Sequence, residues 1–213
     1  MKTELILIRH GQSEGNLHHA FLGHTDLPLT ELGHAQAQRA AEYLATTAPD
    51  AIYASDLLRA YETAEHTAKM LGLPITKSEA LREIFAGAWE GLPFDQLAVD
   101  FAEDYSIWCS DIGASCPTGG ESVRELYLRI HTELVRIAKE NEGRRVLVFL
   151  HATPIRSVSA CLLGYGLSGM KDLPWPTNAS STRLAYEDGV LSLVEYSRDE
   201  YLGDAVTALP SNV

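Results

Sequence analysis

The sequence predicts an α/β protein: a three-layer α/β/α sandwich in which helices cover both faces of a mostly parallel sheet. Two observations support this class. Short aliphatic runs, typical of strands that are buried on both faces, alternate along the chain with longer helical stretches. In addition, the chain has 213 residues, of which 46% are hydrophobic and 22% charged, and this suits one domain with its own core. We therefore expect residues 1–213 to form a single domain.

The first part of the chain contains two strand–helix pairs. Residues 4–8 are an aliphatic run, and we expect a helix from Thr30, which can serve as its N-cap, to about residue 46. Residues 51–54 form a second short strand. A second helix is expected over residues 56–70, because a glycine and a proline follow shortly after it.

The middle of the chain, about residues 91–120, is predicted to be a lid-like insertion. Glycine-containing stretches bracket an irregular segment with several aromatic side chains, which we expect to cover something. Part of the aromatic group should belong to the core, and one or two of its members could line a substrate pocket. The group comprises Trp89, Phe94, Tyr105 and Trp108.

The last part of the chain returns to the alternating pattern and then changes. Residues 121–141 have the spacing of an amphipathic helix, residues 146–150 form another buried strand, and a helix is expected over residues 154–163. Residues 181–186 and 190–196 are joined by a Glu-Asp-Gly turn, which is typical of a hairpin. The sequence thus predicts a C-terminal hairpin.

The charge and the cysteines exclude several classes of function. Seventeen basic against 29 acidic residues give a net charge of −12, so nucleic acid and anionic membranes are poor partners. An anionic small substrate remains compatible if positive charge is concentrated locally. The three cysteines have no metal-ligand spacing, and their odd number favours free thiols, although a Cys109–Cys116 pair stays open.

The sequence gives no sign of a membrane-spanning or signal segment. Only four apolar residues, 5–8, precede Arg9, and such a run is too short for either purpose. No later segment is long enough. We therefore expect a cytoplasmic protein.

Two histidines are predicted to meet at one edge of the sheet. Arg9 and His10 follow the first strand, and His151 follows the strand that begins at residue 146. In parallel sheets, ligands bind beyond the carboxyl ends of the strands. Imidazole is a nucleophile near neutral pH, and arginine neutralises a phosphoryl group with its bidentate fork. The Arg-His-Gly tripeptide alone, however, more often marks a structural strand end.

Further segments extend this pattern along the chain. They are RHGQSEGN at residues 9–16, TDLPLTELG at 25–33, SDLLRAYETA at 55–64, an acid-containing stretch at 81–91, GGES at 119–122, and the strand and helix start at 146–156. In this order they resemble the motifs of the histidine phosphatase superfamily, the phosphoglycerate mutase-like proteins. The match spans nearly the whole chain, and the resemblance implies a phosphoglycerate mutase-like fold.

The resemblance implies how the site would bind and transfer phosphate. His10 would attack phosphorus and become phosphorylated. Arg9, Arg59 and His151 would hold the non-bridging oxygens, and Asn16 would add a neutral hydrogen bond. These residue types suit phosphoryl transfer, which depends mostly on positioning and charge stabilisation. Taken singly, Arg59 could be a surface residue of its helix and Asn16 a turn residue.

Glu83 is the acid–base residue that the resemblance implies. It would protonate the leaving oxygen and then help to deprotonate the water that hydrolyses phosphohistidine, assistance worth roughly 10²–10⁴-fold. Beside a bound phosphate, repulsion between like charges should raise the pKa of Glu83. Taken alone, Glu83 could be a solvated acid. With these residues the chemistry needs no metal and no cofactor.

Two positions depart from the family's pattern. Ala152 stands where relatives have glycine after the second histidine, and it costs little if its φ is negative, as we expect because a helix begins nearby. Leu22 stands beside Gly23, where relatives often have a polar residue. Because leucine cannot hydrogen-bond a substrate, the pocket should prefer a less polar substrate or use a water there. Leu22, Gly23 and Ala152 are therefore candidate pocket residues.

The sequence thus predicts a metal-independent phosphomonoesterase that acts on a small phosphorylated metabolite. Residues 84–91, which follow Glu83, contain no Arg or Lys to grip a substrate carboxylate as the mutases do. A phosphoglycerate mutase is the first alternative, and a non-catalytic phospho-ligand binding module is the second. The oligomeric state stays open, with a homodimer as one option.

Overall fold

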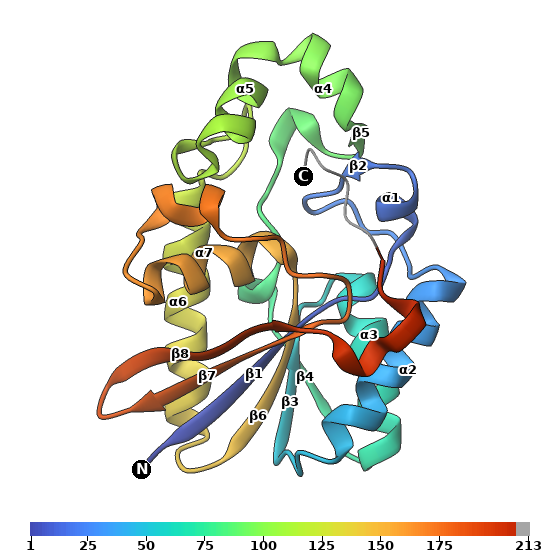
Figure 1. The fold of residues 1–213 in the computed structure, drawn as a ribbon, viewed down its shortest axis with the longest axis vertical. Coiled ribbons are helices and arrows are strands. Elements are labelled where there is room, and N and C mark those ends of the chain that lie inside the picture. Colours follow the sequence, from blue (N-terminus) through green and yellow to red (C-terminus); the bar gives the residue numbers. More distant parts are fainter. Residues whose placement is uncertain (208–213) are drawn as a thin grey trace.

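The computed structural model of the chain describes residues 1–207 and has a six-stranded sheet at its centre (Figure 1). In spatial order the strands are β4 (Ile75–Lys77), β3 (Ala51–Ala54), β6 (Arg145–Leu150), β1 (Thr3–Arg9), β7 (Ser181–Glu187) and β8 (Val190–Arg198). The first four run parallel, and β7 and β8 add an antiparallel hairpin at one edge. The predicted mostly parallel sheet and C-terminal hairpin are confirmed.

Helices cover both faces of the sheet, so the three predicted layers are confirmed as well. One face packs against α2 (Glu31–Ala45), α3 (Leu58–Leu71) and the 3₁₀ helix η5 (Glu200–Ala205). The other face packs against α6 (Val123–Glu140) and α7 (Ala152–Leu162).

The sequences of β1 and of α2 explain this arrangement. In β1, Ile6 and Ile8 pack on the side of α2 and α3, whereas Leu5 and Leu7 pack on the side of α6 and α7. A strand that alternates between two buried faces reads as a continuous aliphatic run. At the start of α2, the Thr30 side chain accepts a hydrogen bond from a backbone N–H of the first turn (3.0 Å), which confirms the predicted N-cap.

Three predicted helix starts are displaced by two residues: α6 begins at Val123 instead of residue 121, and the other two lie at the carboxyl edge of the sheet. α3 begins at Leu58 instead of residue 56, because the Ser55 and Asp56 side chains bind residues of other segments. α7 begins at Ala152 instead of residue 154, directly after the end of β6. Both displacements matter because they occur where strands pass into helices at the carboxyl edge of the sheet.

The α4–α5 segment, residues 92–114, lies above the carboxyl ends of the parallel strands, at the top of Figure 1. The predicted irregular conformation is wrong for much of it, because it contains α4 (Phe94–Asp100) and α5 (Ala102–Ser110). Neither helix has a side-chain N-cap hydrogen bond, so the usual start signal is missing. The short elements elsewhere are α1 (Glu14–Leu17), β2 (Ala20–Phe21), β5 (Leu92–Pro93), η1 (Glu79–Leu81), η2 (Gly87–Trp89), η3 (Ile112–Ala114) and η4 (Leu167–Asp172).

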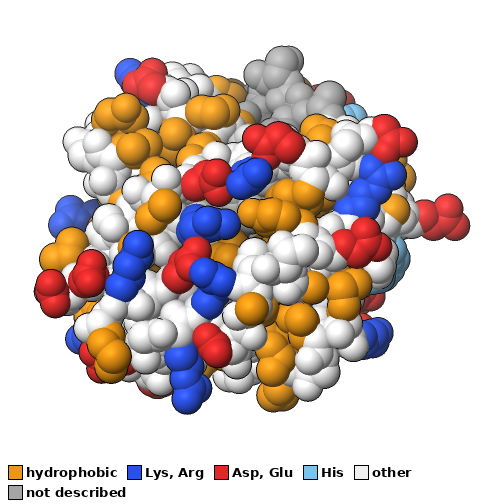
Figure 2. Space-filling model, turned by 60° about the horizontal axis from the view of Figure 1, so that its bottom comes forward, with side chains coloured by type: hydrophobic (Ala, Val, Ile, Leu, Met, Phe, Trp, Pro, Cys, Tyr) orange, Lys and Arg blue, Asp and Glu red, His pale blue; other side chains and the backbone are white. Residues whose placement is uncertain are grey.

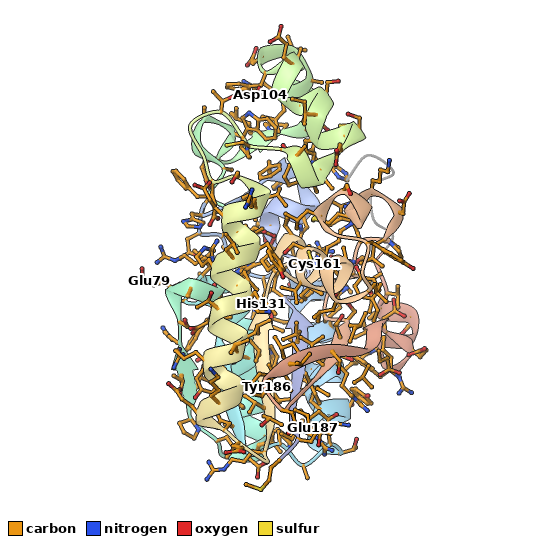
Figure 3. The ribbon with its side chains drawn as sticks, turned by 90° about the vertical axis from the view of Figure 1, so that its left-hand side faces the viewer. Glu79, Asp104, His131, Cys161, Tyr186 and Glu187 are labelled. Carbon is orange, nitrogen blue, oxygen red and sulfur yellow. The ribbon has the colours of Figure 1, made fainter. Side chains whose placement is uncertain are left out.

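The surface carries mixed charge. On the face in Figure 2, acidic and basic side chains are interspersed, without a continuous basic area on that face. Figure 3 gives a side view, with Asp104 of α5 at one end and Tyr186 and Glu187 of β7 toward the other. Within residues 1–207, no helix is long and apolar enough to cross a membrane. The three cysteines are free, as expected.

Candidate active site

An open pocket lies at the carboxyl edge of the sheet. The backbone brings the strand ends together there: His10 N donates to Leu150 O (3.0 Å), and Ser55 N donates to Phe149 O (2.9 Å). The sequence-predicted residues that line the pocket are Arg9, His10, Asn16, Leu22, Gly23, Arg59, Glu83 and Ala152. His151 lies directly behind it, so the structure gathers all nine predicted residues at one place.

His10 has one ring nitrogen engaged and the other available. Its Nδ1 is 2.7 Å from Gly11 O, and because a carbonyl only accepts, Nδ1 carries the proton and Nε2 keeps its lone pair. Burial, and secondarily the charges of Arg59 and Arg9, hold the pKa of His10 well below its ordinary value. The imidazole is therefore neutral at physiological pH, which is its nucleophilic form.

The chain after His10 is fixed by a close approach to α2. A Cβ at Gly11 would lie 2.5 Å from the carbonyl oxygen of Gly33, so glycine is required there. Gly11 N also donates to Thr63 Oγ1 of α3 (3.0 Å). The end of β1 is thus held against both helices on that face of the sheet.

Arg9 and Arg59 are buried cations that are only partly satisfied. Arg9 donates from Nη1 to Pro176 O (2.6 Å). Arg59 donates from Nη1 to Thr25 O (2.9 Å) and from Nη2 to Gly23 O (2.8 Å). The Nε–H group of each arginine has no hydrogen-bond partner among the described residues. Burial lowers the pKa of each to about 10, so both stay charged at neutral pH.

Glu83 reaches the pocket at the N-terminus of α7. Its Oε1 accepts from Ile84 N (2.8 Å) and its Oε2 from Thr153 N (3.2 Å). Burial raises the pKa of Glu83, outweighing these hydrogen bonds. The sequence predicted the same direction from the repulsion of a bound phosphate, but burial alone already produces it.

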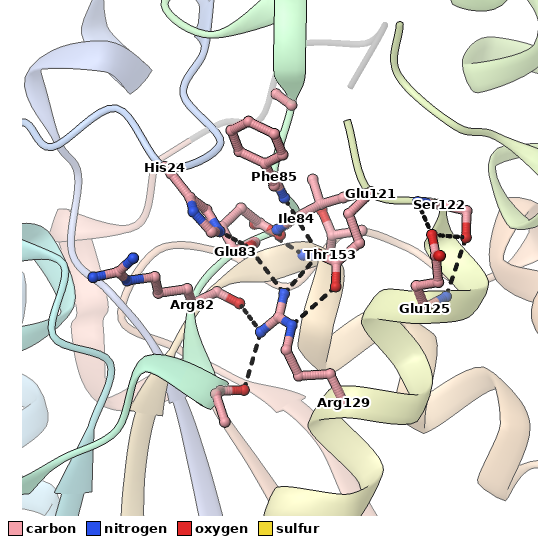
Figure 4. A network of polar contacts seen from close by, with 12 residues as sticks. His24, Arg82, Glu83, Ile84, Phe85, Glu121, Ser122, Glu125, Arg129 and Thr153 are labelled. Carbon is pink, nitrogen blue, oxygen red and sulfur yellow. Dashed lines mark hydrogen bonds and ion pairs between the residues drawn. The ribbon is translucent and has the colours of Figure 1, made fainter. Parts of the chain in front are cut away.

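Arg129 of α6 holds the segment that carries Glu83 (Figure 4). It donates from Nη1 to Ala80 O and Arg82 O (both 3.0 Å) and from Nη2 to Glu83 O (3.2 Å). The carboxylate of Glu121 binds its Nε and Nη2 (2.9 and 2.7 Å). Because three of these hydrogen bonds go to one stretch of backbone, residues 80–83 are fixed relative to α6.

His151 lies behind His10, with the ring centroids 5.2 Å apart at an interplanar angle of 61°. Its Nε2 is 2.9 Å from Ser55 Oγ, which itself accepts a hydrogen bond from Leu57 N (3.3 Å). A hydroxyl has one proton and two lone pairs, so Ser55 can donate to Nε2 or accept a hydrogen bond from it. In the described part of the chain, Nδ1 has no partner. Burial and the charge of Arg59 lower the pKa of His151.

Asn178 is a positioning residue that sequence reasoning missed. Its Nδ2 donates to His10 O (3.1 Å) and to Asn16 Oδ1 (3.2 Å). Because Asn16 uses its oxygen here, its amide nitrogen stays available to the pocket. Nothing in the sequence around Asn178 marks it, since it acts only through residues more than 160 positions away.

Glu90 is a second residue whose role the sequence did not reveal. It accepts from the backbone N of His24 (2.8 Å) and of Thr25 (2.6 Å). This loop supplies the carbonyl groups that bind Arg59. Glu90 stands within the acid-containing stretch at residues 81–91, and that motif was the one signal that could have pointed to it.

The two departures from the family's pattern are both at the pocket. Ala152 is the first residue of α7 and is not among the residues with positive φ, so the expected unstrained alanine is confirmed. Leu22 lies beside Gly23, where the chain has a φ of 51°. Of the aromatic group, Phe94 and Trp108 line the pocket, and Trp89 and Tyr105 belong to the core, in line with the mixed expectation. The sequence did not point to Phe21, Thr153 or Trp175, which also line it.

Comparisons with known proteins agree with this architecture. The chain is 36% identical over 159 residues to a phosphoglycerate mutase-like protein 4 of Arabidopsis thaliana, covering 73% of this chain and 69% of that one. It is 35% identical over 189 residues to a glucosyl-3-phosphoglycerate phosphatase of Mycobacterium tuberculosis, covering 85% and 84%. The structure of YhfR from Bacillus stearothermophilus superposes with a TM-score of 0.90 at 28% identity, covering 94% of this chain and 99% of that one.

Some relatives are longer than this chain, which spans 55% of the length of a mycobacterial bifunctional protein to which it is 34% identical. The fold and its neighbours define an α/β protein of the phosphoglycerate mutase-like class. The family model described as histidine phosphatase superfamily (branch 1) matches residues 5–199, and the chain belongs to that superfamily.

Proposed function

We propose that this chain is a metal-independent phosphomonoesterase that acts on a small phosphorylated metabolite through a phosphohistidine on His10. One observation carries the proposal. The available Nε2 of His10 lies in a pocket lined by Arg9 and Arg59, and the buried Nε–H groups of both arginines lack partners among residues 1–207. Unpaired buried donors cost free energy, and phosphoryl oxygens would satisfy them.

The first chemical step transfers the phosphoryl group to the protein. His10 Nε2 attacks phosphorus, so an N–P bond forms as the ester P–O bond breaks. Glu83 gives its proton to the leaving oxygen, which departs as an alcohol. The Nδ1–H···O bond to Gly11 stabilises the positive charge that the imidazole gains. The two arginines hold the equatorial oxygens.

The second step returns the protein to its starting state. Glu83, now a carboxylate, accepts a proton from a water that attacks phosphorus. The N–P bond breaks, its electron pair returns to His10 Nε2, and inorganic phosphate leaves. Burial raises the pKa of Glu83, which favours its acid form in the first step, and the carboxylate left by that step is the base for the second.

The charged lining favours a phosphatase over a mutase. Among the described residues that line the pocket, the basic or carboxylic side chains other than His10 are Arg9, Arg59 and Glu83, all of them assigned to the phosphoryl group or the proton transfer. A phosphoglycerate mutase needs a further cation to hold the carboxylate of its bisphosphate intermediate. The lining supplies none, in agreement with the lack of Arg or Lys over residues 84–91.

Hydrolysis of p-nitrophenyl phosphate and a panel of phosphomonoesters in EDTA tests the proposal. Turnover that survives EDTA supports it. Turnover abolished by EDTA would show that the mechanism is wrong, and turnover that needs bisphosphoglycerate would favour the mutase. Binding of inorganic phosphate without any turnover would favour a phospho-ligand binding module.

The pH dependence of kcat/KM is expected to follow His10 and Glu83. Because the pKa of His10 is lowered, the acidic limb should lie well below 6.5, the ordinary value. Because the pKa of Glu83 is raised above its ordinary 4.5, its acid form persists beyond that pH, and activity is lost as the pH rises through the raised value. A profile from about pH 4 to 9 at constant ionic strength checks this, and an acidic limb at or above pH 6.5 would contradict it.

A further inference from the structure

The pocket is divided into a polar half and an apolar half. The phosphoryl-binding and proton-transfer groups described above form the polar half. The apolar half is contributed by segments far apart in the chain: β2, the start of α4, α5, and the loop that follows η4. Its aromatic members are Phe21, Phe94, Trp108 and Trp175. We call these four rings the aromatic wall.

Given the proposed phosphomonoesterase activity, we infer that the aromatic wall binds the leaving group, so the preferred substrates are phosphomonoesters of aromatic or otherwise apolar alcohols. The phosphate oxygens and the organic part of such a molecule need surroundings of opposite polarity. The polar half of the pocket suits the phosphate oxygens, and the apolar half suits the organic part. No charged side chain lies among the described members of the apolar half.

The rings of the wall hold one another in place. The Phe21 ring lies 4.8 Å from Trp108 and 6.0 Å from Phe94, both edge to face, measured between centroids. Trp108 and Trp175 are nearly parallel, at 28° and 6.4 Å. Trp89, fully buried, packs behind Phe21 at 5.5 Å and behind Trp108 at 6.1 Å. Interlocked rings of this kind form a stiff surface, which is suited to binding a flat guest.

Trp175 is the member of the wall that is tied to the phosphate site. The carbonyl of Pro176 accepts from Arg9 Nη1 (2.6 Å), and the carbonyl of Pro174 accepts from Tyr196 Oη (2.6 Å). Two prolines restrict φ on both sides of the tryptophan. The guanidinium of Arg156 lies over the indole ring, 4.2 Å from its centroid. The position of the ring is therefore fixed relative to Arg9.

The same lining disfavours polar leaving groups. A carboxylate that enters the apolar half would lose its hydration without gaining a cation from the residues that line it, where the indole N–H groups of Trp108 and Trp175 are the donors of the aromatic wall. Leu22, where a polar side chain would change this, presents only methyl groups. Transfer of an apolar ring from water to the aromatic wall is favourable instead, because apolar surface is removed from water. We expect a preference of about 10–100-fold in kcat/KM.

The test compares benzyl phosphate with glycerol 3-phosphate and 3-phosphoglycerate, which are all esters of primary alcohols. In all three esters the same kind of P–O bond is broken, and only the organic group attached to it differs. Wild-type protein should prefer benzyl phosphate by about 10–100-fold. Trp175→Ala should lower the ratio of kcat/KM for benzyl phosphate to that for glycerol 3-phosphate by about tenfold, and Trp175→Phe should retain most of it. Tyr165→Ala, at an exposed aromatic residue outside the pocket lining, should leave the ratio unchanged.

Several results would overturn the inference. Equal kcat/KM for the three esters, or a preference for glycerol 3-phosphate or 3-phosphoglycerate, would show that the wall does not bind the leaving group. An equal loss on all esters in Trp175→Ala would mean that the residue only positions Arg9. If no ester is turned over in any condition, the proposed phosphatase function fails, and the substrate preference fails with it.

Discussion

His10→Ala is expected to lower kcat/KM for every phosphomonoester by about 10⁴-fold or more, because it removes the atom that forms the covalent intermediate. The loss should be the same for esters of good and poor leaving groups, since neither can be attacked without Nε2. Binding of inorganic phosphate should persist within about tenfold, because the buried Nε–H groups of Arg9 and Arg59 remain. Steady-state kinetics and calorimetry measure the two quantities separately.

His18→Ala is the matched control, since the side chain of this histidine is 70% exposed and lies outside the pocket lining. It should leave kcat and KM unchanged. Rapid quenching of the wild type with a fast substrate should trap a phosphorylated protein that is labile to acid and stable to base, as phosphohistidine is. A His10→Ala protein that still hydrolyses esters at a tenth of the wild-type rate would exclude His10 as the nucleophile.

The sheet and half of the site could be predicted because they depend on local sequence. An aliphatic run that alternates between two buried faces identifies β1, and the residues that follow β1 and β6 must then meet at one edge. Arg9, His10 and His151 follow from that reasoning. The residues Arg59, Asn16 and Glu83 came only from the resemblance, because a helix-face arginine or an acid in a loop has no local feature that points to a pocket.

The parts that were missed depend on contacts between distant segments. Glu90 acts on backbone groups 65 and 66 positions away, and Asn178 acts on His10 168 positions away. A periodic pattern of hydrophobic residues in the sequence gives no information about hydrogen bonds between residues so far apart in the chain. The helices α4 and α5 escaped prediction for a different reason: they are short, lack side-chain caps and have no regular aliphatic stripe. The buried residues are Leu97 in α4 and Tyr105 and Trp108 in α5.

Burial shifts the pKa of the proposed nucleophile and the pKa of the proposed proton donor in opposite directions. It lowers the pKa of His10, which favours the free base, and raises the pKa of Glu83, which favours the free acid. Both shifts favour the neutral form that the first step requires. Because His10 and Glu83 have separate roles, we predict that replacing Glu83 will slow the two chemical steps to different extents, depending on the leaving group.

Glu83→Gln is expected to lower kcat/KM for benzyl phosphate by roughly 10²–10⁴-fold, because an alkoxide leaves poorly without a proton. The effect on p-nitrophenyl phosphate should take another form. Nitrophenolate leaves without protonation, so His10 should still be phosphorylated quickly, while the hydrolysis of phosphohistidine slows for want of a base. Stopped-flow absorbance should then show a burst of about one equivalent of nitrophenolate followed by slow turnover.

The burst distinguishes an acid–base role of Glu83 from a structural one. If the glutamine variant only misplaced the segment that Arg129 holds, both esters would lose activity together and no burst would appear. Glu79→Gln is the matched control, because Glu79 directly precedes that segment and its side chain is 79% exposed. This control should keep wild-type kinetics on both esters. A burst in Glu83→Gln with an unchanged rate on benzyl phosphate would assign leaving-group protonation to another residue.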